Sequence, residues 1–248
     1  MPRIYTKKEI IILKEGGKKL AQIVKVLTKN IKEGKTSVEI DGLAFKLMTE
    51  AGGKPSFLNH DGFPASTCIS INEEVVHSAP SKRKFKNGDI VGIDAGLLYK
   101  GLHTDMAITV PVGEIDNKTR VFLDTAKEAL NKAIELARPG NTTGHLGEVI
   151  QRLVEKRRFS IVRELSGHGV GFELHEEPTI PNFGKKGSGE TLKPGMVIAI
   201  EPIINMGGRE VETAIDGWKV KTKDNSLSAH FEHTIVITEN GNLILTKI

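Results

Sequence analysis

Two segments of the chain repeat one pattern, in which an apolar strand ends in a carboxylate and a second apolar strand contains another. The two copies comprise residues 88–94 with 103–110 and residues 195–201 with 230–237, and their acids are Asp94, Asp105, Glu201 and Glu232. Burying an ionised carboxylate without a partner is very costly, so a cationic group must compensate. A metal centre is the simplest explanation for four acids at matched positions of a duplicated frame.

Strand geometry predicts that these acids converge. Side chains alternate between the two faces of a strand, so Asp94 shares its face with Gly92, and Glu201 shares its face with Ala199. A small residue two positions before each acid leaves room above the sheet. If the two halves of the chain face each other, the four carboxylates meet in one pocket.

Each half opens with helical patterns that precede its strands. Apolar residues recur at helical spacing from Ile10 to Leu27 and from Val121 to Ile134, and each half then has a second, shorter helical segment. In the first half we expect Ser37 to cap that segment, which runs to about Ala51. The order helix, helix, strands, written twice, predicts an α+β fold with helices on one side of a sheet.

The chain shows no linker or low-complexity segment. We therefore expect residues 1–248 to form a single domain, whose two pseudo-symmetric halves span about 1–113 and 114–248. No apolar run reaches the length of a membrane span, and we read no signal peptide, so we expect a cytoplasmic protein. No long apolar stripe is left over, which predicts a monomer.

Three histidines accompany the acids. His168 lies in the glycine-rich run 167–171, where the backbone can approach a ligand closely. His175 follows seven residues later, and His77 lies much further away in the sequence. Each alone is more often an ordinary hydrogen-bonded residue. Together with the four acids, they are candidates for metal binding or catalysis.

The composition of the site indicates its chemistry. Four carboxylates and an imidazole are too acidic for a structural zinc site, which prefers Cys and His. They suit two divalent ions about 3.5–4 Å apart, which generate hydroxide near neutral pH. Hydrolysis of an amide or ester is the predicted reaction. Phosphate esters are disfavoured because these motifs contain no glycine-rich phosphate loop.

The remaining polar features carry less information. The single Cys68 sits in an apolar alternation and reads as a small buried hydrophobe rather than a nucleophile. The net charge is +4, with basic clusters that either bind an anionic partner such as ribosomal RNA or form solvated turns and helix ends. These clusters are residues 82–86, 156–158 and 185–186.

The ordered set of acids and histidine resembles the ligands of the pita-bread metallopeptidases. Four motifs are similar to those of the methionine aminopeptidase family within that group: residues 68–77, 167–171, 175–178 and 226–234. Glu201 follows His175 by only 26 positions, which leaves no room for the helical insertion of the type II enzymes. The chain therefore resembles type I without an N-terminal extension, in a pita-bread fold with a curved, antiparallel-rich sheet and helices on its outer side.

The resemblance implies a role for each motif residue. Asp94 would hold one metal ion, Asp105 and Glu232 would bridge two, and His168 and Glu201 would hold the second. The metals would be Co, Mn, Fe or Zn. The implied catalytic residues are His77, His175 and Glu201, with Glu201 as the proton shuttle, His175 on the scissile carbonyl and His77 near the scissile nitrogen. The implied walls of the methionine pocket are Phe63, Cys68 and Trp218.

The implied activity is removal of the initiator methionine from nascent chains whose second residue is small. An Xaa-Pro peptidase of the same fold is the first alternative, although such enzymes usually carry a large N-terminal domain. A non-catalytic relative that binds peptide or the ribosome is the second, although such relatives typically lose ligands. Neither membrane association nor sequence-specific nucleic-acid binding is expected.

Overall fold

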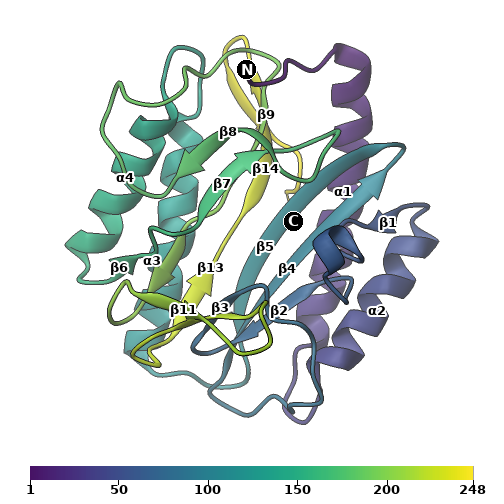
Figure 1. Ribbon diagram of the computed structural model, residues 1–248, viewed down its shortest axis with the longest axis vertical. Helices are drawn as coiled ribbons and strands as arrows, with labels where there is room; N and C mark the ends of the chain where they lie inside the picture. The colour runs from purple at the N-terminus through teal and green to yellow at the C-terminus, as the bar shows by residue number, and fades with distance from the viewer. Residues whose placement is uncertain (248) are drawn as a thin grey trace.

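The computed structural model describes residues 1–247 and contains four long helices packed against antiparallel strands (Figure 1). The helices are α1 (Lys7–Asn30), α2 (Ser37–Glu50), α3 (Asn117–Leu136) and α4 (Thr143–Lys156), with a short 3-10 turn η1 (His60–Gly62). The strands of the first half are β1 (Lys54–Pro55), β2 (Cys68–Ile71), β3 (Glu74–Val76), β4 (Ile90–Tyr99) and β5 (Leu102–Pro111). The remaining strands are β6 (Ser160–Ile161), β7 (Ser166–Gly169), β8 (Glu176–Pro181), β9 (Val197–Ile200), β10 (Ile203–Asn205), β11 (Val211–Thr213), β12 (Val220–Thr222), β13 (Ser228–His230), β14 (His233–Thr238) and β15 (Gly241–Ile244).

The two helices of the first half begin with reciprocal capping interactions. The hydroxyl of Thr6 accepts the Glu9 N–H and the Glu9 carboxylate accepts the Thr6 N–H, and Thr36 and Glu39 repeat this arrangement at α2. The predicted cap Ser37 was therefore one residue late. Thr36 takes the extended backbone conformation that a cap requires, whereas Ser37 is already the first helical residue.

Two larger sheets form the centre of the molecule, and two three-stranded sheets, β13-β10-β6 and β11-β12-β3, flank them. One larger sheet contains β1, β4 and β2 with β5 paired to β4, and the other has the order β15-β14-β9-β7-β8. All ladders between the described strands are antiparallel. The predicted curved, antiparallel-rich architecture is confirmed.

The two larger sheets meet where β5 lies beside β14. The Thr234 hydroxyl donates to the Asp105 carbonyl oxygen (2.7 Å) and accepts from the Asp105 N–H (2.9 Å). Thr109 makes the same pair of bonds to the backbone of His230, at 2.9 and 3.0 Å. These matched bonds across the junction relate the two halves by pseudo-two-fold symmetry.

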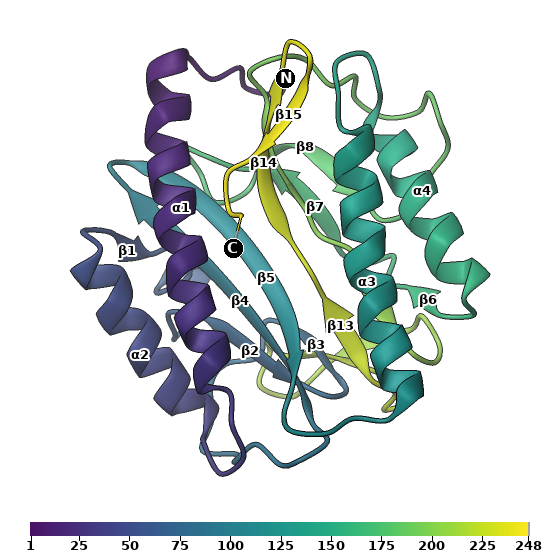
Figure 2. The ribbon, with the colours of Figure 1, turned by 180° about the vertical axis from the view of Figure 1, so that it is seen from behind.

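All four long helices cover one face of the sheets, as Figure 2 shows from behind. Val91 and Ile93 on β4 pack in one core cluster with residues of α1 and α2, whereas Ile198 and Ile200 on β9 pack with residues of α3 and α4. The opposite face of β4 carries Asp94, whereas Val197 and Ala199 on the opposite face of β9 pack in a third core cluster. Within residues 1–247, no helix is long and apolar enough to cross a bilayer.

Candidate metal centre and adjoining pocket

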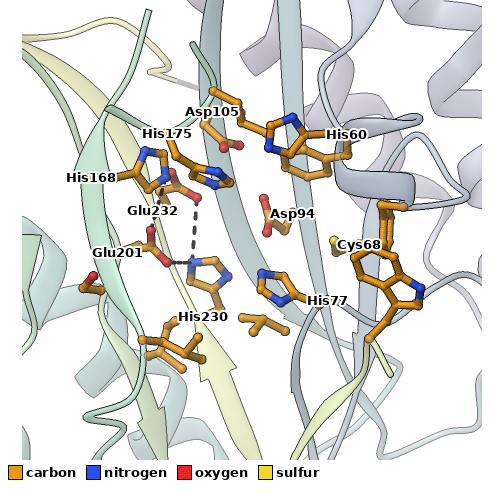
Figure 3. A pocket seen from close by; sticks show the side chains of 18 of the residues that line it. His60, Cys68, His77, Asp94, Asp105, His168, His175, Glu201, His230 and Glu232 are labelled. Atoms are coloured by element: carbon orange, nitrogen blue, oxygen red, sulfur yellow. Dashed lines mark ion pairs between the residues drawn. The ribbon is translucent and has the colours of Figure 1, made fainter. Parts of the chain in front are cut away.

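A cavity of about 390 Å³ is lined by residues from both of the larger sheets and the loops beside them. Its walls include every site residue predicted from the sequence: Phe63, Cys68, His77, Asp94, Asp105, His168, His175, Glu201, Trp218 and Glu232. Figure 3 shows the acids and histidines gathered at one end and Cys68 toward the other. Segments far apart in the sequence therefore contribute to one site.

The strands place the acids at the junction of the two sheets. Asp94 lies on β4 and Asp105 on β5, within one long hairpin. Glu201 directly follows β9, and Glu232 lies between β13 and β14, where its N–H donates to the Ala107 carbonyl oxygen (2.9 Å). His168 lies on β7, opposite Ala199 of β9. Ala199, the small residue expected to leave room above the sheet, therefore lies directly beside His168 on the neighbouring strand.

The polar end has the features expected of a cation site. Ligand atoms of Asp105, His168 and Glu232 all lie within 4.8 Å of one another. One oxygen each of Asp94, Asp105 and Glu232 is buried without a hydrogen-bond partner. Buried carboxylate oxygens normally have a partner, so these three atoms fit a cluster that binds a cation. The donor set of oxygens and imidazole nitrogen fits hard or borderline divalent ions.

The pKa values of the buried acids also indicate a cation site. Burial raises the pKa of Asp94 and of Glu232 well above the usual range, and the charges of neighbouring acids add to the effect. Burial raises the pKa of Asp105 to about 6, although His168 opposes the shift. Carboxylates this close repel one another when ionised, and a bound divalent ion removes that repulsion. Binding of a divalent cation therefore stabilises the cluster.

Two further histidines line the cavity and were not predicted as site residues. The Nε2 atom of His230 lies 3.3 Å from Glu201 and 3.7 Å from Glu232. Strand alternation was a usable signal, because His230 precedes Glu232 by two positions. His60 lies in η1 with its ring 5.4 Å from that of His175, and no periodicity in the sequence marks it.

His77 and His175 occupy the edge of the acid cluster. The ring of His175 packs edge-on against that of His168, with centroids 4.5 Å apart. Burial, followed by the neighbouring histidine charges, lowers the pKa of His175 to about 4. Burial also lowers the pKa of His77. Both imidazoles are thus neutral near pH 7, and a neutral imidazole can both donate and accept a hydrogen bond.

The other end of the cavity is apolar. Phe63 and Cys68 are buried, and the indole of Trp218 meets the Phe63 ring edge-on with centroids 5.5 Å apart. Phe57 and Leu174 complete this cluster. Burial and the charges of the nearby acids raise the pKa of the Cys68 thiol, so it stays protonated, as its reading as a small hydrophobe requires.

An antiparallel α+β fold with a carboxylate-rich, imidazole-containing cation site defines a class, the metallohydrolases that activate water. The family model of metallopeptidase family M24 matches residues 12–239. The chain belongs to this family.

Its relatives include methionine aminopeptidase 1 of Bacillus subtilis (strain 168), 45% identical over 98% of both chains. The crystal structure of a methionine aminopeptidase from Thermotoga maritima superposes with a TM-score of 0.98 at 44% identity over the full length of both chains. A prolidase from Pyrococcus furiosus is 30% identical with a TM-score of 0.82, but this chain covers only 65% of it. The fold is therefore shared with both activities, and the full-length match is to the methionine aminopeptidases.

Proposed function

We propose that the protein is a metal-dependent aminopeptidase that removes an N-terminal methionine when the second residue is small. One observation carries the proposal: the unsatisfied acid cluster and the apolar compartment are the two ends of a single cavity. A peptide whose first side chain fills the apolar end has its first peptide bond at the polar end. The full-length similarity to methionine aminopeptidases supports the same reaction.

Five residues would hold two divalent ions, drawn from Co, Mn, Fe or Zn. They are Asp94, Asp105, His168, Glu201 and Glu232. Bound there, the ions would supply Lewis-acid activation of the carbonyl and a lowered pKa for water. The unpartnered oxygens of the acids support this assignment.

Glu201 is the proposed general base. Its carboxylate lies between two imidazoles, 3.5 Å from His168 and 3.3 Å from His230. The Asn182 side-chain amide donates to its backbone carbonyl (2.9 Å), which holds the end of β9 in place. A carboxylate held this way takes a proton from the attacking water and passes it to the leaving amine nitrogen.

His175 and His77 are the proposed partners of the peptide bond. A ring N–H of neutral His175 donates to the scissile carbonyl oxygen and stabilises negative charge that develops there. His77 lies at the same rim and contacts the scissile nitrogen or the residue after it. The lowered pKa of each ring keeps it neutral, so each offers one donor and one acceptor at working pH.

The methionine side chain would occupy the compartment formed by Phe63, Cys68 and Trp218. Methionine is unbranched and polarisable, so a close-fitting aromatic and thiol-lined pocket selects it by shape and by sulfur–aromatic contact. The protonated, buried thiol of Cys68 is compatible with a neutral wall.

The proposal extends to the organisation and setting of the protein. Residues 1–248 would act as one catalytic domain, monomeric and in the cytoplasm, on the N-termini of nascent chains. The basic clusters 82–86, 156–158 and 185–186 would provide any ribosome contact. Their local charge, not a base-specific motif, supports that last assignment.

The decisive experiment measures the free N-terminal amino acid released, methionine from Met-Ala-Ser and Met-Leu-Ser and alanine from Ala-Pro-Ser, with metal-free protein and each divalent ion added in turn. Metal-dependent cleavage of Met-Ala-Ser alone is expected. Preferential cleavage of Ala-Pro-Ser would instead assign the chain to the Xaa-Pro peptidases. Absence of cleavage, together with retained peptide binding, would identify a non-catalytic binding protein.

A further inference from the structure

The loop that carries His175 is contacted by the N-terminal segment of the chain. This loop, residues 170–175, connects β7 to β8, and Leu174 on it is also part of the apolar compartment. The Tyr5 N–H donates to the Gly195 carbonyl oxygen (2.8 Å), just before β9. Figure 1 accordingly shows the N-terminus at the β9 end of the second sheet. The N-terminal segment, which is distant in sequence from residues 170–175, therefore contacts the loop that carries His175.

Tyr5 makes the central contacts of this arrangement. Its hydroxyl lies 2.9 Å from both carboxylate oxygens of Glu176, the residue after His175. The same hydroxyl accepts the N–H of Phe172 at 3.0 Å, and the two aromatic rings stack with centroids 5.8 Å apart. One side chain thus contacts both the interior of the loop, at Phe172, and the first residue of β8, at Glu176.

Neighbouring groups strengthen the same attachment. The guanidinium of Arg3 lies 4.5 Å from the centre of the Phe172 ring, and its Nε is 3.9 Å from Glu176. A Cβ added at Gly171 would collide with the Tyr5 hydroxyl, so only glycine permits this approach. On the other side, the Gly171 carbonyl accepts the His103 N–H of β5 (2.6 Å). The loop is held between the N-terminal segment and β5.

The Tyr5 phenol is suited to a fixed donor role. The residue is only 4% exposed, and burial raises the pKa of its hydroxyl well above the usual value. It therefore keeps its proton across the working range of the protein. A hydrogen bond from a neutral donor to a buried carboxylate is stronger than one between neutral groups.

We propose that Tyr5 is a positioning residue for His175: it binds Glu176 and Phe172 and so holds the His175 imidazole at the rim of the acid cluster. The inference rests on the proposed role of His175 in catalysis. Tyr5 itself touches no reacting atom. Displacing a catalytic group by about 1 Å can cost up to about 100-fold in rate, so a contact outside the cavity can control turnover.

Tyr5→Phe tests the inference, because it removes the hydroxyl and keeps the ring stack. We expect kcat for Met-Ala-Ser to fall roughly tenfold, with KM changed less than about twofold, since the ground-state pocket stays in place. Metal content should equal that of the wild type. Tyr99→Phe is the matched control, because Tyr99 is the second of the two tyrosines and its ring lies against the ammonium groups of Lys19 and Lys100. It should leave kcat unchanged.

A double-mutant cycle separates positioning from general stabilisation. If Tyr5 acts through His175, then Tyr5→Phe should cost less than about twofold once His175→Ala is present. An equal loss of kcat in both backgrounds would overturn the inference, as would no loss in the wild-type background. Arg3→Ala provides a milder second variant should Tyr5→Phe fold poorly. A loss of about two- to threefold is expected for it, and again none beside His175→Ala.

Amide hydrogen exchange tests the contact of Tyr5 with the loop 170–175 independently of activity. Tyr5→Phe should accelerate exchange of the Phe172 N–H, which loses its acceptor, whereas Tyr99→Phe should not. Unchanged exchange at Phe172 would show that the Tyr5 hydroxyl does not hold the loop. Faster exchange in a protein that releases no methionine would instead count against the proposed function, while the contact of Tyr5 with the loop would still be supported.

Discussion

The two halves of the molecule share a frame but divide the chemistry unequally. In the first half, Asp94 and Asp105 lie 11 positions apart on one continuous hairpin of two ten-residue strands. In the second half, Glu201 and Glu232 lie 31 positions apart, and the strands beside them, β9 and β14, are shorter. The additional residues form β10 to β13 and contribute Trp218 and His230 to the cavity. Each half contributes two acids, and only the second contributes a histidine, His168, to the proposed ligand set.

The strand register shows where the halves diverge. Ser70 on β2 lies opposite Gly92, and His168 on β7 lies opposite Ala199, which is the counterpart of Gly92. The same frame therefore places a serine in one half and an imidazole in the other. Ser70 bonds to the Ser78 hydroxyl instead of pointing a metal ligand into the cavity. The two halves share the strand pairing, and the residue at this one position decides whether the half offers an imidazole ligand.

The acids of the second strands are not true counterparts. Thr109 and Thr234 make the matched bonds across the junction, to His230 and Asp105 respectively. Counting from these threonines, Asp105 corresponds to His230. The sequence comparison that matched Asp105 with Glu232 was thus displaced by two residues along the strand. Asp105 on β5 and Glu232 in the link between β13 and β14 nevertheless both line the cavity.

The largest loss of activity is expected when Glu201 is substituted. Glu201→Gln removes a proposed ligand and the proposed proton shuttle at once, so kcat for Met-Ala-Ser should fall by at least about 10³-fold. Glu239→Gln, at an exposed position, should retain full activity. Near-normal turnover of the Glu201 variant would show that another group is the base.

Exchanging a second-half residue for its first-half counterpart breaks the asymmetry directly. His168→Ser should weaken divalent-metal binding by roughly 100-fold or more, measured by calorimetry on metal-free protein, because an imidazole ligand is lost. Ser70→Ala at the matching position should leave metal affinity unchanged. Equal effects at the two sites would contradict the division of roles between the halves.

The helix caps differ between the halves in the same way. Thr36 and Thr142 each precede a 14-residue helix, but only Thr36 makes a side-chain capping bond. Thr36→Ala should lower the free energy of unfolding by about 1 kcal/mol in urea titrations, and Thr142→Ala by less than about 0.3 kcal/mol. A larger loss at Thr142 would mean that its hydroxyl has a role beyond capping.

A smaller pH effect follows from the same cap. Bonds from Lys35 and Thr36 lower the pKa of Glu39 from 4.5 to about 2, so the unfolded state takes up this proton first. Its stabilising contribution is present above about pH 4.5 and is lost as the pH falls toward 2. Glu39→Gln should therefore make unfolding less dependent on pH between these limits. The second half has His145 at the equivalent helix position and lacks this contribution.

Much of the site followed from local rules, and the rest depended on tertiary packing. Alternation along strands was enough to place Asp94 and Glu201 on the cavity face, because both strands are regular up to the acid. It could not show that β5 and β14 join through Thr109 and Thr234, since nothing local specifies which strands meet. The contact of Tyr5 with Glu176 spans 171 positions and depends entirely on the assembled fold.

The central claim is that both halves contribute ligands to one metal centre. Crystals grown with Mn²⁺ and measured for anomalous scattering test this most directly. We expect two anomalous peaks in the cavity, in contact with Asp94 and Asp105 from the first half and with His168, Glu201 and Glu232 from the second. Peaks bound by one half alone, or no peak at these residues at saturating Mn²⁺, would contradict it.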